Sequence, residues 1–304
     1  VKSAQVGRGR FLLGDDLTRL LAFARVRREP MAEQNLRFTR RRHAGGGLYF
    51  ILNRGEQPVD GWVTLQTGAR SAAVFDAMTG ESGLAPIRTA ADGAAEVYLQ
   101  LAPGESRVVK TFGGAVRGPA YEYFRLAGEP VLLNGEWSVR FVEGGPELPP
   151  ARRANGLEPW TNFDGDAYKR FSGTAVYTHT FEGPRARATD YVLHLGRVAE
   201  SARVRLNGTD LGTHIVAPFR VRVPASLLRD RNTLEVTVSN LMANRIIDME
   251  RRGVRWKKFY NTNFPARRPE NRGADGLFDA SKWSPRDSGL LGPVTLAPVE
   301  RISF

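Results

Sequence analysis

The feature that most constrains the fold is a run of alternating apolar and polar residues that ends in an Asn-Gly pair. Ala202, Val204 and Leu206 alternate with arginines, which is typical of a strand with one buried and one solvent-facing side. Asn207-Gly208 follows directly and favours a tight hairpin, because such a turn needs positive φ at both central residues. The same alternation recurs at 191–195, 219–223 and 233–239. We therefore predict antiparallel strands of a jelly roll.

Turn-forming residues divide the chain into three predicted parts. Residues 1–30 contain one strand and one helix, and a single helix cannot bury its own apolar face. We expect this short α/β segment to belong to a preceding α/β domain or to pack on the next one. Short strands separated by glycine-containing turns predict an immunoglobulin-like β-sandwich over 31–115. Glycines at 113–119 indicate a linker, and 121–304 is predicted to be the jelly-roll β-sandwich, which makes the fold class mainly β.

The composition excludes several classes of protein. The chain has no cysteine, so it has neither disulfides nor thiolate metal sites, and its four histidines are too scattered for zinc. No apolar run approaches the ~18 residues of a membrane span, and no signal peptide is visible. The net charge of +12 favours anionic partners, but the arginines mostly emerge singly from strands and no nucleic-acid motif accompanies them. We expect no nucleic acid and no membrane as a partner, and interpret the charge as a solvated surface or an attraction to acidic polysaccharide.

Two groups of motifs carry a resemblance. The run "LGRVAESARVRLNG" from Leu195, with "NTLEVTVSN" from Asn232, resembles the galactose-binding-like jelly roll found in several glycoside hydrolases. The second group consists of "LMANRIIDM" from Leu241, "RWKKF" from Arg255, "WSP" from Trp283 and "SGLLGPV" from Ser288. Together these motifs are similar to the C-terminal end of glycoside hydrolase family 106, the α-L-rhamnosidases.

The resemblance implies a role for the chain. It would be the C-terminal accessory part of a periplasmic or secreted α-L-rhamnosidase, which releases terminal α-L-rhamnose from glycosides or polysaccharides. The family's catalytic carboxylates lie in a (β/α)8 barrel that precedes such sandwiches, and this sequence shows no series of alternating strands and helices. We therefore expect no catalytic residue here, and expect as partners a rhamnose-containing glycoside or polysaccharide and the missing catalytic barrel of the same protein. An autonomous carbohydrate-binding module and a purely structural or dimerising pair of sandwiches remain alternatives.

Aromatic and planar polar side chains in predicted loops are the candidates for contact with carbohydrate. Tryptophan stacks on sugar faces, while amide, guanidinium and ammonium groups bind hydroxyls or carboxylates. The candidates are Trp256, Lys257, Trp160, Trp283, Asn244 and Arg245. The opposing interpretation is structural: the tryptophans are partly buried, Asn240 caps the helix predicted over 242–251, and Arg245 pairs with Asp248.

Asp164 and Asp166 flank a glycine and are candidate metal ligands. Jelly rolls of this kind often carry a structural calcium, which takes six to eight oxygen ligands. Two carboxylates supply too few of these ligands, so an ordinary turn is the alternative. The sequence requires no cofactor, and a structural calcium is the one metal that it leaves possible.

Overall fold

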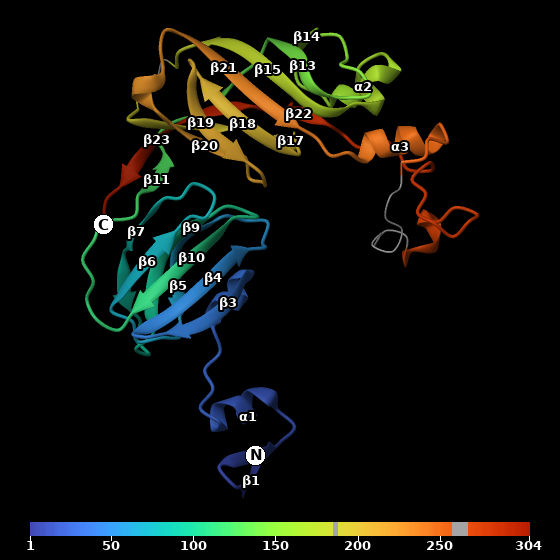
Figure 1. Ribbon diagram of the computed structural model, residues 1–304. Helices are drawn as coiled ribbons and strands as arrows, with labels where there is room; N and C mark the ends of the chain where they lie inside the picture. The colour runs from blue at the N-terminus through green and yellow to red at the C-terminus, as the bar shows by residue number, and fades with distance from the viewer. Residues whose placement is uncertain (185–187, 257–266) are drawn as a thin grey trace. The chain divides into compact units, whose positions relative to one another are not determined.

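The computed structural model describes residues 1–184, 188–256 and 267–304, and most of them form antiparallel strands (Figure 1). The chain divides into two compact units. The first comprises Val1–Tyr123 with Ser303–Phe304, and the second comprises Phe124–Ile302. The prediction of a mainly β chain built from β-sandwiches is confirmed. The immunoglobulin-like and jelly-roll topologies stay predictions.

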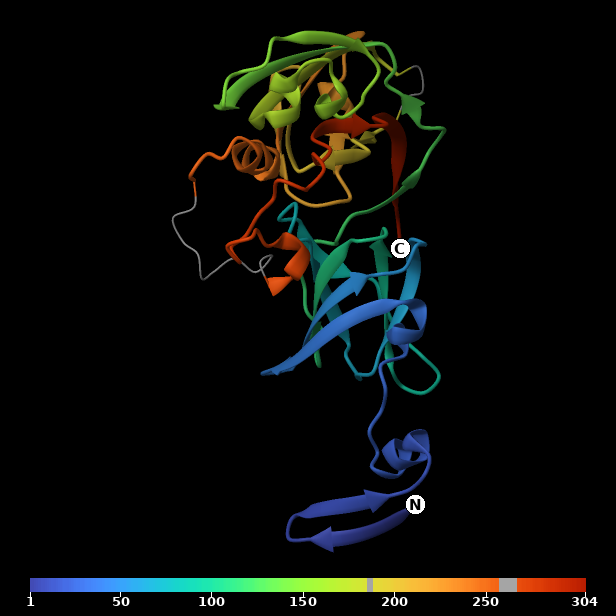
Figure 2. The ribbon, with the colours of Figure 1, turned by 90° about the vertical axis from the view of Figure 1, so that its right-hand side faces the viewer.

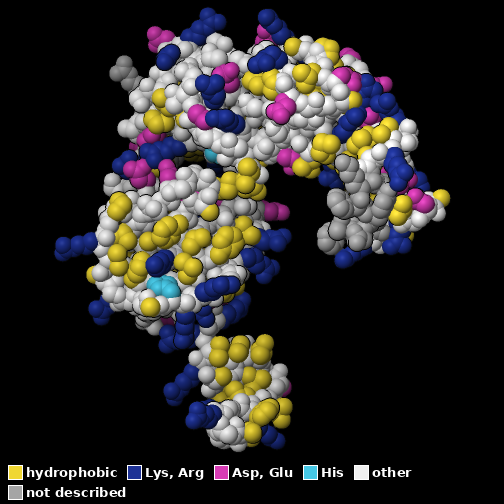
Figure 3. Space-filling model, in the orientation of Figure 1, with side chains coloured by type: hydrophobic (Ala, Val, Ile, Leu, Met, Phe, Trp, Pro, Cys, Tyr) yellow, Lys and Arg dark blue, Asp and Glu magenta, His cyan; other side chains and the backbone are white. Residues whose placement is uncertain are grey.

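The first unit begins with a small segment of two strands and a helix. Its elements are β1 (Lys2–Val6), β2 (Gly9–Leu13) and α1 (Leu17–Phe23). Asp16 caps the helix, since its Oδ1 accepts from the backbone N–H groups of Thr18 and Arg19 at 2.8 and 3.3 Å. No residue of these three elements is buried. Phe11 and Leu13 are 69% and 70% exposed, and Figure 3 shows hydrophobic side chains gathered on the surface of this segment.

The rest of the first unit is a β-sandwich. Its elements are η1 (Pro30–Gln34), β3 (Leu36–His43), β4 (Gly46–Asn53), β5 (Val59–Leu65), β6 (Ser71–Phe75), β7 (Ser82–Ala85), β8 (Ile87–Thr89), β9 (Ala95–Leu101) and β10 (Ser106–Phe112). One sheet has the order β3-β4-β10-β6-β7 and the other the order β5-β9-β8. Alternate residues of both sheets form a single core, as in Ile51 of β4, Val109 of β10 and Val97 of β9. Burial of one face of each sheet is what the two-residue period of the sequence predicts.

The second unit holds the larger core. Its strands are β11 (Tyr123–Leu126), β12 (Val131–Leu132), β13 (Glu136–Gly145), β14 (Arg152–Asn155), β15 (Ser172–Glu182), β16 (Asp190–His194), β17 (Arg197–Ala199), β18 (Ser201–Leu206), β19 (Thr209–His214), β20 (Arg220–Pro224), β21 (Arg231–Ser239), β22 (Gly289–Gly292) and β23 (Thr295–Ile302). Its helices are η2 (Trp160–Asn162), α2 (Asp166–Arg170), η3 (Ala225–Leu227), α3 (Ala243–Arg251) and η5 (Pro269–Asn271).

Two sheets enclose the core of the second unit, as Figure 2 shows from the side. One has the order β14-β13-β15-β21-β18-β19, and the other has the order β11-β23-β16-β20, with β12 added beside β23. Tyr177 of β15 and Val236 of β21 contribute from the first sheet, and Leu193 of β16 and Val221 of β20 from the second. The predicted hairpin is confirmed: β18 and β19 pair, and Asn207 and Gly208 have φ of 52° and 83°.

Candidate functional site

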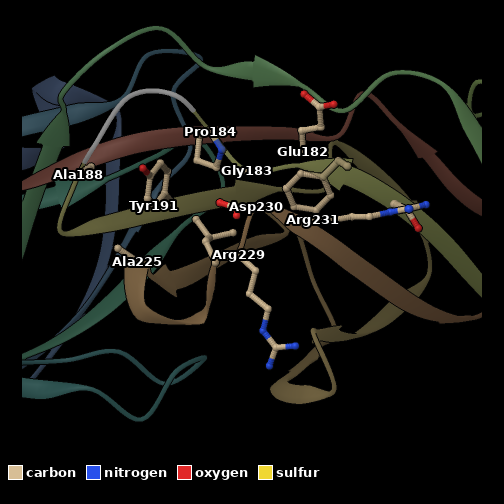
Figure 4. Close-up of a pocket in the computed structure, with 12 residues that line it drawn as sticks. Glu182, Gly183, Pro184, Ala188, Tyr191, Ala225, Arg229, Asp230 and Arg231 are labelled. Atoms are coloured by element: carbon tan, nitrogen blue, oxygen red, sulfur yellow. The ribbon is translucent and has the colours of Figure 1, made fainter.

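An open cleft of about 960 Å³ lies at one end of the second unit's sandwich (Figure 4). We call it the end cleft. Its lining comes from the end of β15, the start of β16, η3 with the loop after it, and the start of β21. In each sheet these strand ends are paired neighbours, because Glu182 lies opposite Arg231 and Asp190 lies opposite Pro224. The cleft therefore opens where the two sheets of the sandwich separate.

The floor of the end cleft is apolar and aromatic. Tyr191 is a core residue that is 3% exposed, and Phe181 and Leu228 pack against the same core. The ring of Phe181 lies parallel to the ring of His179, with centroids 6.2 Å apart and an interplanar angle of 7°. His179 in turn stacks on the buried Trp137 at 4.5 Å. This stack fixes the orientation of Phe181, so the floor is formed before any ligand arrives.

Charged side chains form the rim. Glu182, Arg229, Asp230 and Arg231 are all exposed cleft residues. Figure 4 shows the ends of Glu182 and Arg229 pointing to opposite sides of the cleft. Within the described residues, none of the four side chains makes a hydrogen bond or an ion pair. Guanidinium and carboxylate groups that bond to no described residue can bind hydroxyl or carboxylate groups of a ligand.

Two asparagines hold the loop that carries the rim. Asn207 Nδ2 donates to Leu227 O at 2.7 Å and to Asn232 Oδ1 at 2.9 Å, while its Oδ1 accepts from Thr233 N at 2.9 Å. Asn232 is fully buried. Its Oδ1 also accepts from Arg229 N at 2.9 Å, and its Nδ2 donates to Arg229 O at 2.8 Å. The hairpin turn predicted from the sequence thus anchors the loop that presents Arg229 and Asp230.

A glycine lets this loop approach the end of β15. Gly183 N donates to Asp230 O at 2.8 Å. A Cβ at Gly183 would lie 2.4 Å from Arg229 O, closer than real Cβ contacts. Only glycine therefore allows this backbone contact, and the contact sets the width of the cleft between Glu182 and the loop.

The geometry suits binding better than catalysis. An aromatic floor with a rim of hydrogen-bonding groups matches the general make-up of small-molecule sites. A glycosidase needs two carboxyl groups, one of them held as an acid by burial or by a second carboxylate. The carboxylates in the end cleft, Glu182 and Asp230, are both exposed. Burial therefore supplies neither of them with the environment of a general acid.

The structure places the predicted site residues elsewhere. Trp160 is 0% exposed and belongs to the core, with its ring edge-on to Phe141 and Phe171 at 5.4 and 5.8 Å. This burial removes it from the surface on which we expected contact with carbohydrate. Its backbone N–H donates to Ser288 O at 2.9 Å, and this contact draws the proline-rich loop inward. The sequence could not show such a long-range contact.

Trp256 and Trp283 lie in a small cluster around Phe278, outside the end cleft. Both rings are edge-on to Phe278, at 6.4 and 5.4 Å. Trp256 Nε1 donates to Glu250 at 2.7 Å, and Trp283 Nε1 donates to Asn271 at 2.9 Å. Both tryptophans are partly buried, and their contact with carbohydrate stays a prediction. Lys257, predicted beside Trp256, lies outside the described residues.

Asn244 and Arg245 make structural contacts. Asn244 is 2% exposed; its Oδ1 accepts from Arg286 N at 2.7 Å and its Nδ2 donates to Arg286 O at 2.9 Å. Arg245 pairs with Asp248 at 3.2 Å, as the structural interpretation predicted. The other half of that interpretation is wrong, because Met242 is the N-cap of α3 and no side chain caps the helix. Asn240 instead bonds to Gly173 N and Phe171 O, at 2.8 and 3.1 Å.

The aspartates proposed for calcium do not form a cluster. Asp164 and Asp166 are exposed, and Asp166 begins α2. Among the residues that the structure describes, no group of three or more His, Cys, Asp or Glu is placed to hold a metal ion. Two exposed carboxylates do not fit the ligand number of calcium.

Within residues 1–184, 188–256 and 267–304, no helix is long and apolar enough to cross a membrane.

The end cleft was missed because its parts are far apart in the sequence. Residues 180–184, 188 and 191 meet residues 225 and 228–231 only once the sandwich has formed. A local signal did exist, since a glycine, a proline and a run of charged residues mark the two strand ends. Such runs are common at turns and indicate no site by themselves.

Comparison with known proteins finds that the chain is similar to parts of two carbohydrate-active enzymes. No family model matches the sequence. Over 188 residues the chain is 35% identical to a putative β-glucuronidase of Formosa agariphila, a match that covers 55% of this chain and 16% of that protein. The solved rhamnosidase from Novosphingobium sp. PP1Y matches with a TM-score of 0.68 and 26% identity, over 98% of this chain and 27% of that one. Both are named glycoside hydrolases. The chain thus spans only a small part of the length of either protein.

Proposed function

We propose that the chain is the C-terminal accessory β-sandwich part of an α-L-rhamnosidase of glycoside hydrolase family 106. The observation that carries this proposal is the match to a rhamnosidase over 98% of the chain with a TM-score of 0.68. The motifs from 195 to 294 support the same family by resemblance. In this role the chain braces a catalytic barrel in an exported enzyme that removes terminal α-L-rhamnose from glycosides or polysaccharides.

The segment that holds β1, β2 and α1 supports the proposed contact with a barrel. Phe11, Leu13 and Leu17 are 68–70% exposed, and an isolated hairpin with one short helix is marginally stable in water. Apolar side chains gathered in this way mark surfaces that pack on another protein part. We propose the catalytic barrel of the same protein as that part.

The end cleft is the proposed contact with carbohydrate. Its fixed aromatic floor offers a face for stacking, and its rim offers charged groups that bond to no described residue. Arg229 and Arg231 suit hydroxyls and the carboxylates of an acidic sugar. The ligand proposed is therefore a rhamnose-containing polysaccharide, and the rim accepts one that also carries acidic residues.

Calorimetric titration with an α-L-rhamnose polysaccharide tests this function. The wild-type chain is expected to bind, and the double variant Arg229→Ala/Arg231→Ala is expected to bind at least tenfold more weakly, since each substitution removes charge-assisted hydrogen bonds. Arg140→Ala is the matched control, because Arg140 is an exposed arginine of the same unit outside the cleft. Equal affinity in all three proteins would exclude the end cleft as the binding site of the polysaccharide. Failure of the wild type to bind would favour a purely structural role.

A further inference from the structure

The first unit contains a cleft of its own. It has a volume of about 730 Å³ and lies between the end of η1, the β4–β5 loop and the start of β5. We call it the Trp62 cleft, after the aromatic residue in its wall. All its lining residues fall between 34 and 62, so it is complete within the first unit.

Trp62, in the wall of the cleft, lies on the outer face of its sheet, and neighbouring side chains hold its ring in place. Trp62 is partly buried and lies opposite Tyr98 of β9. The guanidinium of Arg88 lies over its ring, 4.3 Å from the centroid, and the ring of Tyr98 meets it edge-on at 5.7 Å. Cation–π and edge contacts of this kind restrict the indole to one position. Trp62 therefore lies on the outer side of the sheet, unlike its buried neighbour Val63.

A buried asparagine shapes the opposite side of the cleft. Asn53 is fully buried, and its Nδ2 donates to Gln57 O and Leu101 O, both at 2.9 Å. Its Oδ1 accepts from Gly55 N at 2.9 Å. These bonds tie both ends of the 54–57 loop to the sandwich. The loop is therefore preorganised, which lowers the entropic cost of binding.

The polar side chains of the Trp62 cleft are available to a ligand. Five exposed polar residues line the cleft: Gln34, Asn35, Arg54, Glu56 and Gln57. Among the described residues, none of these five side chains forms a hydrogen bond or an ion pair. Amides carry both donors and acceptors and can therefore bind hydroxyl groups, which also act as both. The combination of fixed indole, amides and one guanidinium is suited to a ligand rich in hydroxyls.

We propose that the Trp62 cleft is a second carbohydrate site, which binds a neutral oligosaccharide independently of the end cleft. The choice of carbohydrate rests on the proposed function, and the choice of a neutral one rests on charge. Among the lining residues, Glu56 and Asp60 set two carboxylates against the guanidinium of Arg54, and the charge of Arg88 above Trp62 is paired with Glu96 at 2.5 Å. Asp60 also accepts hydrogen bonds from Tyr98 and Gln100. A sugar carboxylate would meet net negative charge here and is disfavoured.

Titration of the full chain with two tetrasaccharides tests the proposal. The probes are a linear α-L-rhamnose tetrasaccharide, which is neutral, and tetragalacturonate, which is acidic and of equal length. The indole N–H signal of Trp62 in an NMR spectrum, assigned with Trp62→Phe, reports on the cleft. We expect the neutral probe to shift this signal. Arg54→Ala/Gln57→Ala should weaken this local binding about tenfold, while Arg117→Ala, a change at an exposed arginine outside the cleft, should leave it unchanged.

The expected preference of the Trp62 cleft for a neutral ligand is tested with a separate variant. Tetragalacturonate is expected to bind at the Trp62 cleft at least tenfold more weakly than the neutral probe, and Glu56→Gln should narrow that difference. A Trp62 signal that ignores the neutral probe, while Arg229→Ala/Arg231→Ala abolishes the chain's binding, overturns the second site and leaves the proposed function intact. A Trp62 signal that shifts in that double variant as in the wild type supports the second site. Absence of any binding to the wild type overturns both carbohydrate sites, the end cleft and the Trp62 cleft.

Discussion

Two histidines of the second unit lie where their charged forms are disfavoured. Burial lowers the pKa of His194, and the nearby charge of Arg220 lowers it further. Its Nδ1 accepts a hydrogen bond from Gly196 N at 3.0 Å, which protonation of that atom would break. Burial also lowers the pKa of His214, which is 8% exposed at the end of β19. Both residues favour a neutral ring in the folded state.

This environment predicts a pH dependence of stability. In the unfolded chain a histidine has a pKa of about 6.5, and both folded values are lower, so the unfolded state binds more protons as the pH falls below that value. The stability contribution is present above the unfolded pKa and is lost as the pH falls. Urea unfolding of the second unit at pH 7.5, 6 and 5 should show a falling free energy. The double variant His194→Gln/His214→Gln should show a shallower slope, and equal slopes would contradict the prediction.

The burial of single side chains was the least predictable property at this scale. Trp160 follows a proline-rich stretch that indicated a surface loop, yet it is fully buried. Trp62 stands in a strand whose residues Val63 and Leu65 are fully buried, yet it faces outward beside Tyr98. In each case the local pattern does not determine burial, because contacts with residues distant in the chain, such as Ser288 for Trp160 and Tyr98 for Trp62, help to decide it.

At the scale of elements, the two-residue period of strands and the residue types at turns predicted the structure well. The Asn207-Gly208 pair predicted a hairpin, and both residues have the positive φ that such a turn needs. The second role of Asn207 was not predictable, because its side chain bonds to residues 20 to 26 positions further along the chain. Strand β1 was likewise not predicted, since it shows no clear alternation between apolar and polar residues.

The anchoring role of Asn207 gives a prediction. Asn207→Gly keeps a residue that accepts positive φ but removes the hydrogen bonds to Leu227, Asn232 and Thr233. We expect the free energy of unfolding of the second unit to fall by about 1–3 kcal/mol, because buried partners such as Asn232 lose a bond. Chemical denaturation monitored for each unit measures this change.

Asn35→Gly is the matched control for this prediction. Asn35 also has positive φ, 58°, but its side chain makes no hydrogen bond to a described residue. The first unit should therefore lose little or no stability. Equal losses in the two variants would mean that the backbone change, and not the side-chain bonds, determines the effect.

For the whole molecule, the sequence was sufficient to predict a mainly β chain with sandwich cores, because each strand must bury one face. The order of the strands in the sheets could not be predicted from the sequence. Strand β10 lies between β4 and β6, and β15 lies between β13 and β21, pairings that join segments far apart in the chain. Both clefts depend on those pairings or on the loops that they position, so local patterns could not reveal them.

The arrangement of carboxylates in the whole chain predicts that it does not cleave glycosides by itself. In the described residues of the two clefts, the carboxylates available are Glu182 and Asp230 in the end cleft and Glu56 and Asp60 in the Trp62 cleft, and all four are exposed. Retaining and inverting glycosidases need a protonated acid beside a second carboxylate that acts as nucleophile or base. We expect the chain to release no product from an aryl α-L-rhamnoside above the buffer rate, and Glu182→Gln or Asp230→Asn to change nothing in that assay. Turnover by the wild type that either variant abolishes would make the chain itself a catalyst and would refute an accessory role.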